Sequence, residues 1–209
     1  MTPAPAILIL AAGASSRMRG ADKLLMDVAG QPCLRVLTER ALATGLPVYV
    51  ALPPDRPART EALHGLKVTQ VVIPDAADGM GHSIRGGISA LPDHVTGALI
   101  LPADMPDIQT ADLVHFTELH RTAPDLIWRA TDAAGTMGHP VIFPKDLFSQ
   151  LSELAGDDGA KSVVKRNLDR LKAVILAGRR ATLDLDTPEA WEAYYSGALR
   201  GSKTSAPQD

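Results

Sequence analysis

Two adjoining stretches of the sequence decide the fold: AILIL at residues 6–10, and AAGASSRMRGADK at residues 11–23. The first is a short continuous apolar run, and small residues follow it directly. Such a run is typical of a strand covered on both faces, as in a parallel sheet, because a strand with one wet face would alternate apolar and polar residues. The second stretch is then the turn at the carboxyl end of that strand.

Further apolar runs repeat this pattern along the chain, with helical periodicity between them. The other strands that we predict span residues 48–52, 68–73, 97–101, 126–130, 140–143 and 173–176. The predicted helices span residues 33–42, 83–91, 111–119, 147–154 and 162–171, and a last one starts at Thr187-Pro188. Strands that alternate with helices indicate a doubly wound α/β fold with a mostly parallel, Rossmann-like sheet. We expect a single domain over residues 1–200 and a small, polar, flexible tail at residues 201–209.

Three single residues carry specific local expectations. Thr110 precedes a periodic apolar stretch, so we predict it as the N-cap of that helix. Pro188 occupies a first helical position, where no backbone N–H is missed. Cys33 falls in an apolar helical stripe, which favours a small core residue over a nucleophile.

The composition excludes several classes of protein. The 209 residues include 21 basic and 24 acidic side chains, which give a net charge of −3 with histidine neutral. A slightly acidic chain binds nucleic acid poorly, because that binding needs clustered cations. The single cysteine excludes an intramolecular disulfide and a cysteine-rich zinc site. No apolar run reaches the roughly 20 residues of a membrane span, and the cationic segment of a secretory signal is missing, so we expect a cytoplasmic protein without membrane contact.

Residues 11–23 carry the chemistry of a polyphosphate-binding loop. Ligands of open α/β sheets bind beyond the carboxyl ends of the strands, which is where this loop is expected. Small residues let backbone N–H groups approach an anion, and Arg17, Arg19 and Lys23 add three positive charges. A Walker loop is excluded because no lysine follows Gly20, and the glycine spacing of a dinucleotide fingerprint is missing. The alternative is an ordinary basic surface turn.

Aspartates after two other predicted elements are candidate metal ligands. Asp104 lies between two prolines just beyond the strand at residues 97–101, so we expect it at the ligand edge of the sheet. Further on, Asp184 and Asp186 share one face of an extended segment. Magnesium usually takes one or two carboxylates and completes its octahedron with phosphates and water. The alternatives are a turn residue for Asp104 and a helix N-cap for Asp186.

The loop resembles the signature of nucleotidyltransferases that couple a nucleoside triphosphate to a phosphate-bearing acceptor. It is most similar to the molybdenum cofactor cytidylyltransferase family, whose guanylyl-transferring relatives usually carry two glycines where this chain has Ala12 and Gly13. Arg19 stands where a glycine is common. The resemblance covers roughly residues 7–195 and implies a fold like that of nucleotide-diphospho-sugar transferases. The loop residues that it implies in nucleotide binding are Leu10, Ala11, Ala12, Gly13, Ser15, Arg17 and Lys23.

The same resemblance assigns roles to residues in five later segments. It implies that Asp104 is the main magnesium ligand and Asp186 the second, with Asp184 in reserve, and that Arg17, Lys23 and Asp104 are catalytic. The segment at residues 79–87 is similar to one that lines the base and ribose, and there the implied nucleotide-binding residues are Gly81, His82 and Ser83. The segments at residues 138–140 and 156–161 resemble acceptor-side motifs, and there the implied residues are His139, Asp157, Asp158 and Lys161. A glycine-rich linker, a structural histidine and a helix cap are the respective alternatives.

These expectations define one function and three competitors. The resemblance implies a Mg²⁺-dependent enzyme that transfers CMP from CTP to the phosphate of molybdopterin and releases pyrophosphate, with a molybdoenzyme or its chaperone as a partner. One competitor is a nucleotidyltransferase of the same fold that uses GTP or a sugar phosphate. Another is a non-catalytic carrier of a phosphorylated pterin. A flavodoxin-like binding module is disfavoured by the cations of the first loop.

Overall fold

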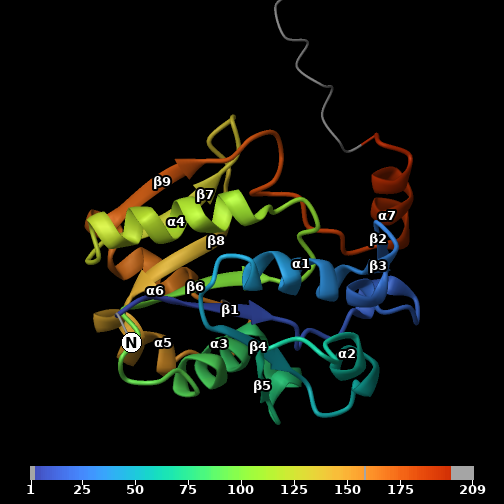
Figure 1. Cartoon of the computed structure of the whole chain (residues 1–209), viewed down its shortest axis with the longest axis horizontal. Coiled ribbons are helices and arrows are strands. Elements are labelled where there is room, and N and C mark those ends of the chain that lie inside the picture. The colour runs from blue at the N-terminus through green and yellow to red at the C-terminus, as the bar shows by residue number, and fades with distance from the viewer. Residues whose placement is uncertain (1–2, 158, 199–209) are drawn as a thin grey trace, which may run out of the picture.

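A seven-stranded sheet in the order β5-β4-β1-β6-β8-β7-β9 runs through the molecule (Figure 1). The computed structural model describes residues 3–157 and 159–198. The strands are β1 (Ala6–Leu10), β4 (Val48–Leu52), β5 (Thr69–Val72), β6 (Gly97–Pro102), β7 (Ile127–Thr131), β8 (Met137–Pro144) and β9 (Leu171–Ile175). Only β8 is antiparallel to its neighbours. The predicted strands are all present, and the mostly parallel α/β sheet is confirmed.

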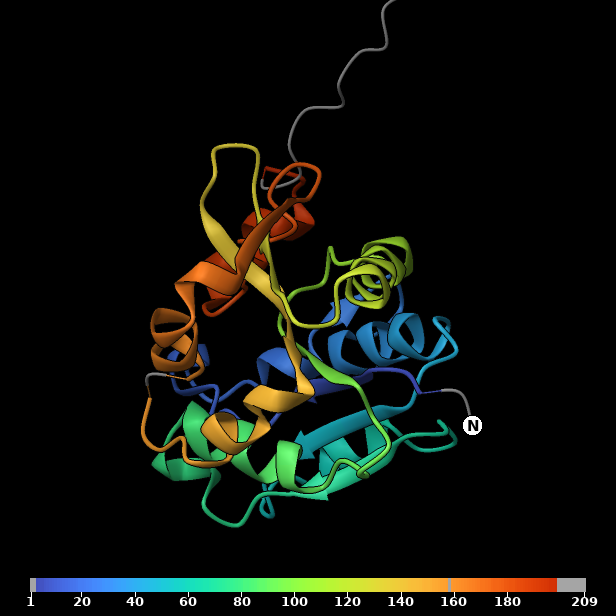
Figure 2. The ribbon, with the colours of Figure 1, turned by 90° about the vertical axis from the view of Figure 1, so that its left-hand side faces the viewer.

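The central strand β1 is apolar throughout because helices cover both of its faces. Ile7 and Ile9 pack on the side of α1 (Cys33–Leu42) and α4 (Thr110–Thr122). Leu8 packs on the other side, where α3 (Met80–Ser89), α5 (Phe148–Ser152) and α6 (Lys161–Arg166) lie. Figures 1 and 2 show these two helix layers on opposite sides of the sheet. Burial on both sides therefore explains the continuous apolar run.

A third apolar cluster lies outside these layers and joins distant parts of the chain. It contains Met18 of the first loop, Cys33, and Leu183 and Leu185 from the segment after β9. Trp191 of α7 (Pro188–Tyr195) completes it, beside the hairpin of β2 (Asp27–Val28) and β3 (Gln31–Pro32). Figure 1 shows α7 next to this hairpin and the first loop. The cluster fixes the first loop against the C-terminal segment, and Cys33 is the buried core residue that was predicted.

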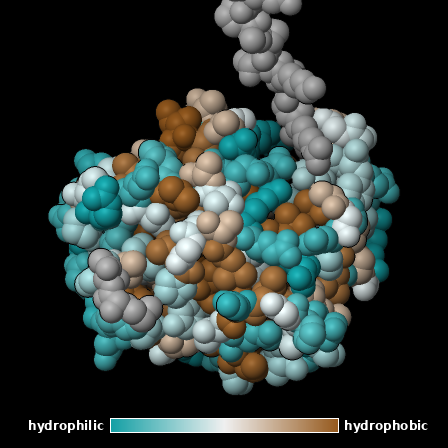
Figure 3. Space-filling model, in the orientation of Figure 1, coloured by the Kyte–Doolittle hydropathy of each residue, from teal (hydrophilic) through white to brown (hydrophobic). Residues whose placement is uncertain are grey.

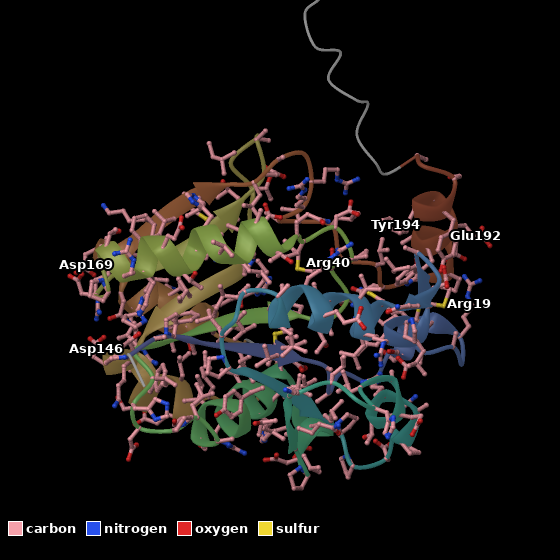
Figure 4. The ribbon with its side chains drawn as sticks, viewed as in Figure 1. Arg19, Arg40, Asp146, Asp169, Glu192 and Tyr194 are labelled. Carbon is pink, nitrogen blue, oxygen red and sulfur yellow. The ribbon has the colours of Figure 1, made fainter. Side chains whose placement is uncertain are left out.

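Connections gather at the end of the sheet where β1 ends. Besides the loop after β1 they include α2 (Pro57–Ala62), which no prediction contained. The short 3₁₀ turns of the chain are η1 (Ser16–Met18), η2 (Lys23–Leu25), η3 (Ala76–Asp78), η4 (Lys145–Leu147) and η5 (Leu168–Arg170). In Figure 4, Arg19 lies at this end of the molecule, and Asp146 and Asp169 lie at the opposite end. The expected ligand edge is thus the edge at which most of the irregular segments meet.

Two local predictions were wrong. The N-cap of α4 is Gln109 instead of Thr110, because Gln109 and Asp112 form a reciprocal capping box across the first turn. The helix predicted for residues 162–171 ends at Arg166, and Leu171 begins β9, which pairs with β7. The last helix starts as predicted, with Thr187 as N-cap and Pro188 at its first position. The tail predicted for residues 201–209 lies outside the described residues.

On the face drawn in Figure 3, apolar patches are interspersed with hydrophilic residues. Within residues 3–157 and 159–198, no helix combines the length and the hydropathy needed to cross a bilayer.

We predict that Gly138→Ala destabilises the protein severely. A Cβ at this position would lie 1.7 Å from the carbonyl oxygen of Ala181, so the strand and the segment beside it would have to separate. We expect the free energy of unfolding to fall by at least about 2 kcal/mol in urea denaturation. Gly13→Ala is the matched control, because a Cβ there meets no atom within 4 Å. Equal losses in both variants would contradict the packing argument.

Candidate functional site

A cavity of about 580 Å³ opens at the edge of the sheet where β1 and β6 end. Its walls come from the loops after β1, β4 and β5 and from the start of α3. Ligands of doubly wound sheets bind at this edge. The residues predicted for the nucleotide site that line it are Leu10, Ala12, Gly13, Lys23, Ser83 and Asp104. Ala11, the first residue of the loop, is buried and does not line the cavity.

Lys23 joins the two predicted metal ligands at the floor of this region. Its ammonium donates to a carboxylate oxygen of Asp104 and, at 2.5 Å, to Oδ1 of Asp186. Arg17, which is exposed, reaches the other oxygen of Asp186 at 2.6 Å. The backbone brings the carboxylates together, because the amide of Leu185 donates to the carbonyl of Asp104. Asp186 is therefore an ion-pair partner, and Thr187 takes the helix-capping role that was its alternative.

The charges of this cluster shift the pKa values of its members. Burial opposes the charge of Lys23, but Asp104 and Asp186 outweigh burial and raise the pKa of Lys23 above its ordinary value. Burial also acts against the charge of Asp186, but the hydrogen bond and the charge of Lys23, together with the charge of Arg17, outweigh burial and lower the pKa of that carboxyl. Burial and the neighbouring carboxylates raise the pKa of Asp184. The cluster thus combines two cationic side chains, Arg17 and Lys23, with the carboxyl groups of Asp104, Asp184 and Asp186.

The same cluster fits a divalent cation. Oδ1 of Asp104 is buried and has no hydrogen-bond partner among residues 3–157 and 159–198. A free carboxylate oxygen beside a second carboxylate is the partial ligand set that magnesium uses when phosphates and water supply the rest. No cluster of three or more candidate metal-ligating side chains occurs in the part of the chain that the structure describes. The geometry therefore fits an ion that arrives together with a phosphate-bearing ligand.

The backbone of the first loop leaves several donors unused. In the described part of the chain, the amides of residues 12–15 have no hydrogen-bond acceptor. Ser15 and Arg19 have positive φ angles of 54° and 52°, and they bracket the 3₁₀ turn η1. Arg19 thus adopts a conformation that glycine adopts more readily, and it pairs with Glu189 at 2.5 Å. Successive free amides are typical of an anion-binding loop.

Arg59, which no sequence prediction contained, lies beneath this loop. Its side chain is completely buried and bonds to the carbonyls of Ala11 and Gly13 and to Asp22 and Ser15. Ser15, which was predicted to contact nucleotide, is therefore engaged with Arg59 and Asp22. Nothing local in the sequence distinguishes Arg59 from other arginines, since its partners lie more than 35 residues away.

The glycine-rich segment at the start of α3 packs mainly against protein. A Cβ on Gly81 would meet the backbone of Ala155 at 2.8 Å, and the amide of Gly81 donates to the carbonyl of Gly156. Nδ1 of His82 lies 2.6 Å from a carboxylate oxygen of Asp75. Gly81 and His82 thus lie outside the lining of the cavity, whereas Ser83 lines it.

A second cavity, of about 210 Å³, adjoins the first and has a more apolar wall. Leu10, Met80 and Asp157 line both cavities, so the two meet at these residues. His139 and Lys161, two of the predicted acceptor residues, line the second cavity. The remaining residues of its lining include Arg129, Ile84, Ile100, Val141 and Phe143. Asp158 lies outside the described residues.

Burial, together with the nearby cationic groups, keeps His139 neutral in the second cavity. Burial, and after it the charge of Arg129, lowers the pKa of His139 to about 4. Arg129 was missed by the sequence analysis, although it follows an apolar run in a predicted strand. Its Nε donates to the carbonyl of Gly138, which holds the guanidinium beside the His139 segment. At neutral pH, Arg129 and Lys161 supply the positive charge of this cavity.

We predict that Lys23→Met lowers the free energy of unfolding at pH 7 by about 3 kcal/mol, because it removes the cation between Asp104 and Asp186 and leaves only the exposed Arg17 beside Asp186. The deficit should shrink below about pH 4, where the carboxylates take up protons. Urea unfolding at several pH values measures it. The control is Lys172→Met, which removes an exposed lysine of β9. A deficit equal to that of the control would contradict the role of the cluster.

We predict that His139 makes stability fall in mildly acidic solution. Its pKa is lower in the folded chain, about 4, than the ordinary value of 6.5. Below 6.5 the unfolded chain therefore binds a proton that the folded chain does not, so stability drops by up to about 1.4 kcal/mol per pH unit until about pH 4. His139→Gln should flatten this part of the stability curve. An NMR titration that places the pKa of His139 near 6.5 would contradict the prediction.

Solved structures show the same fold. The manganese complex of Rv0371c from Mycobacterium tuberculosis H37Rv is 23% identical, with a TM-score of 0.77 over 95% of this chain and 99% of that one. The CMP:2-keto-3-deoxy-manno-octonic acid synthetase complexed with CTP is 17% identical, with a TM-score of 0.73 over 94% and 99% of the two chains. The domain therefore has the fold of nucleotidyltransferases.

Sequence comparison gives the family. The purine catabolism protein PucB of Bacillus subtilis (strain 168) is 28% identical over 195 residues, which span 88% of this chain and 93% of PucB. The family model for the MobA-like NTP transferase domain matches residues 7–171. The chain therefore belongs to the MobA-like NTP transferase domain family and is a nucleotidyltransferase.

Proposed function

We propose that this nucleotidyltransferase moves CMP from CTP to the phosphate of a molybdopterin-type cofactor and releases pyrophosphate. The observation that carries the proposal is that the first loop, Lys23 and Asp104 line one cavity, and that Lys23 pairs there with Asp104 and also with Asp186, which lies outside the lining. The adjoining cavity, which cationic side chains line, is the proposed binding site of the second substrate.

The triphosphate is bound by the first loop. The free amides of residues 12–15 and the exposed guanidinium of Arg17 are donors that a polyphosphate can accept from. Arg17 and Lys23 already neutralise carboxylates, so the incoming phosphates compete with Asp104 and Asp186 for these cations. Nucleotide binding is thus an exchange of ion-pair partners.

Asp104 and Asp186 are the proposed metal ligands. Mg²⁺, when bound, neutralises charge on the phosphate oxygens and helps to orient them. The unpaired Oδ1 of Asp104 supports this assignment. So does the manganese complex of the structurally similar Rv0371c. Asp184 is more exposed and stays the reserve ligand.

The chain's own residues act mainly by positioning and by electrostatics. An oxygen of the acceptor phosphate forms a bond to the α-phosphorus of CTP, the bond to the β-phosphate oxygen breaks, and pyrophosphate leaves. A phosphate nucleophile is already ionised at neutral pH, so the reaction needs no general base. Lys23 and Arg17 stabilise the charge that accumulates on the leaving group.

The second cavity suits an acceptor with an apolar body and an anionic group. Ile84, Val141 and Phe143 offer an apolar wall, and Arg129 and Lys161 offer positive charge. His139, neutral at pH 7, can exchange hydrogen bonds with a ring substituent. A phosphorylated pterin combines these properties. The Bacillus subtilis relative is named a purine catabolism protein. By analogy with that name, we propose that the product is used in purine catabolism.

Ala12 supports CTP as the donor. Ala12 lines the large cavity, at a position where the guanylyl-transferring relatives usually have glycine. A methyl group at this position leaves less room for a purine than a hydrogen atom does. The CTP complex of the structurally similar synthetase supports the same choice.

We predict that Asp104→Asn lowers kcat by at least about 100-fold with CTP, Mg²⁺ and molybdopterin, because it removes the carboxylate charge from the reaction centre. Pyrophosphate release and the mass of the product are measured. Asp169→Asn is the control, since Asp169 lies at the opposite end of the molecule (Figure 4). Retained turnover in Asp104→Asn would remove the metal assignment.

The same assay separates the competing functions. A screen of CTP, GTP and ATP should give the fastest product formation with CTP, and Ala12→Gly should increase the relative rate with GTP. Product formation only with a sugar phosphate would replace the acceptor. Binding of CTP and molybdopterin without any pyrophosphate release would identify a carrier instead of an enzyme.

A further inference from the structure

Arg59 is a charged side chain in the interior of the protein, and every one of its N–H groups has an acceptor. Its relative exposure is 0%. Nε and Nη2 bind the two carboxylate oxygens of Asp22 at 2.7 and 3.0 Å, and Nη2 also binds Oγ of Ser15 at 3.1 Å. Nη1 donates to the carbonyls of Ala11 at 2.6 Å and Gly13 at 2.8 Å. A guanidinium has five N–H donors, and all five are used.

These bonds reach both ends of the first loop. Ala11 and Gly13 lie where the loop leaves β1, and Asp22 lies just before η2, which begins with Lys23. The guanidinium is a rigid planar fork, so it fixes the positions of its acceptors relative to one another. The backbone of Arg59 belongs to α2 and not to the loop, so its position is set independently of the loop.

The bonds to the two carbonyls also decide what the loop presents to the cavity. A carbonyl that points into an anion site repels phosphate, and here two of the nearest carbonyls are occupied by Arg59. The amides of residues 12–15, in contrast, are left without acceptors among the described residues. Arg59 thus withdraws acceptors from the loop and leaves its donors available.

We propose that Arg59 is a positioning residue that holds the first loop in its phosphate-binding conformation from below. The proposal rests on the proposed function, because it assigns triphosphate binding to this loop. Arg59 touches no substrate, since it does not line the cavity. Lysine cannot replace it, because one ammonium cannot reach two carbonyls, a hydroxyl and both carboxylate oxygens in this planar arrangement.

The test separates positioning from simple charge compensation. Arg59→Met alone leaves Asp22 buried without its partner, so the central variant is Arg59→Met/Asp22→Asn, which removes both charges and keeps an acceptor for the amide of Leu24. Arg59→Lys keeps the charge and is the second variant. Arg35→Met is the matched control, because Arg35 donates to the carbonyls of Ala62 and His64 at the other end of α2.

Two readouts are measured in each variant: hydrogen exchange, without nucleotide, of the loop amides that donate to backbone carbonyls, which are those of Ala11, Met18 and Ala21, and the KM and kcat for CTP with Mg²⁺. In the double variant and in Arg59→Lys we expect exchange of these amides to rise about tenfold or more. We expect KM for CTP to rise about tenfold, while kcat at saturating CTP changes less than about threefold. Arg35→Met should leave the exchange of these amides and KM near their wild-type values.

Three results would overturn the proposal. The first is a double variant with wild-type exchange and KM, because Arg59 would then only neutralise Asp22. The second is an Arg59→Lys variant with wild-type KM, which decides the matter if the double variant fails to fold. The third is an equal effect in Arg35→Met. If the wild-type protein binds no nucleotide at all, the proposed function fails, whereas the exchange data still decide whether Arg59 orders the loop.

Discussion

The ammonium of Lys23 between Asp104 and Asp186 is the interaction on which the candidate site depends. It connects the loop after β1, the end of β6 and the segment that follows β9. Without this cation, two largely buried carboxylates would repel each other. The C-terminal segment would then lose the ion pair that helps to hold it beside β6. The apolar cluster around Met18 and Trp191 acts in the same direction, because it joins the same loop to α7. The site is therefore held by charge at its centre and by apolar packing behind it.

The central strands were predictable because they are runs of apolar residues with both faces covered, as Ile7, Leu8 and Ile9 show, whereas the edge strands β5 and β9 are largely exposed. The direction of β8 was not predictable in this way, since an apolar run reads the same for parallel and antiparallel pairing. The short helix α2 was missed because its six residues carry only a weak apolar pattern. The cap of α4 was misplaced because Thr110 and Gln109 can both cap a helix, and only the reciprocal bond with Asp112 decides between them.

Within the site, the position of Asp104 was predictable because it follows closely after a strand, β6. Lys23 reaches it from the loop after β1, and Asp186 from the segment between β9 and α7. Prediction failed where a residue's role depends on a distant contact. Position 81 needs a glycine because the backbone of Ala155 lies against it. Arg59 cannot be told apart from the other basic residues in the sequence, which has 21, because its role depends on the fold that places the first loop above it. Which of the assembled side chains contact nucleotide stays a prediction that the assays above address.

The position of Asp186 in the chain has a consequence for biosynthesis. All strands of the large sheet precede it, and the matched family domain ends at residue 171. While the chain emerges from the ribosome, the sheet can assemble with Lys23 paired to Asp104 alone. The ion pair between Lys23 and Asp186 forms only after the later segment has been translated and has docked. The sheet of a nascent chain can therefore fold before the candidate site is complete.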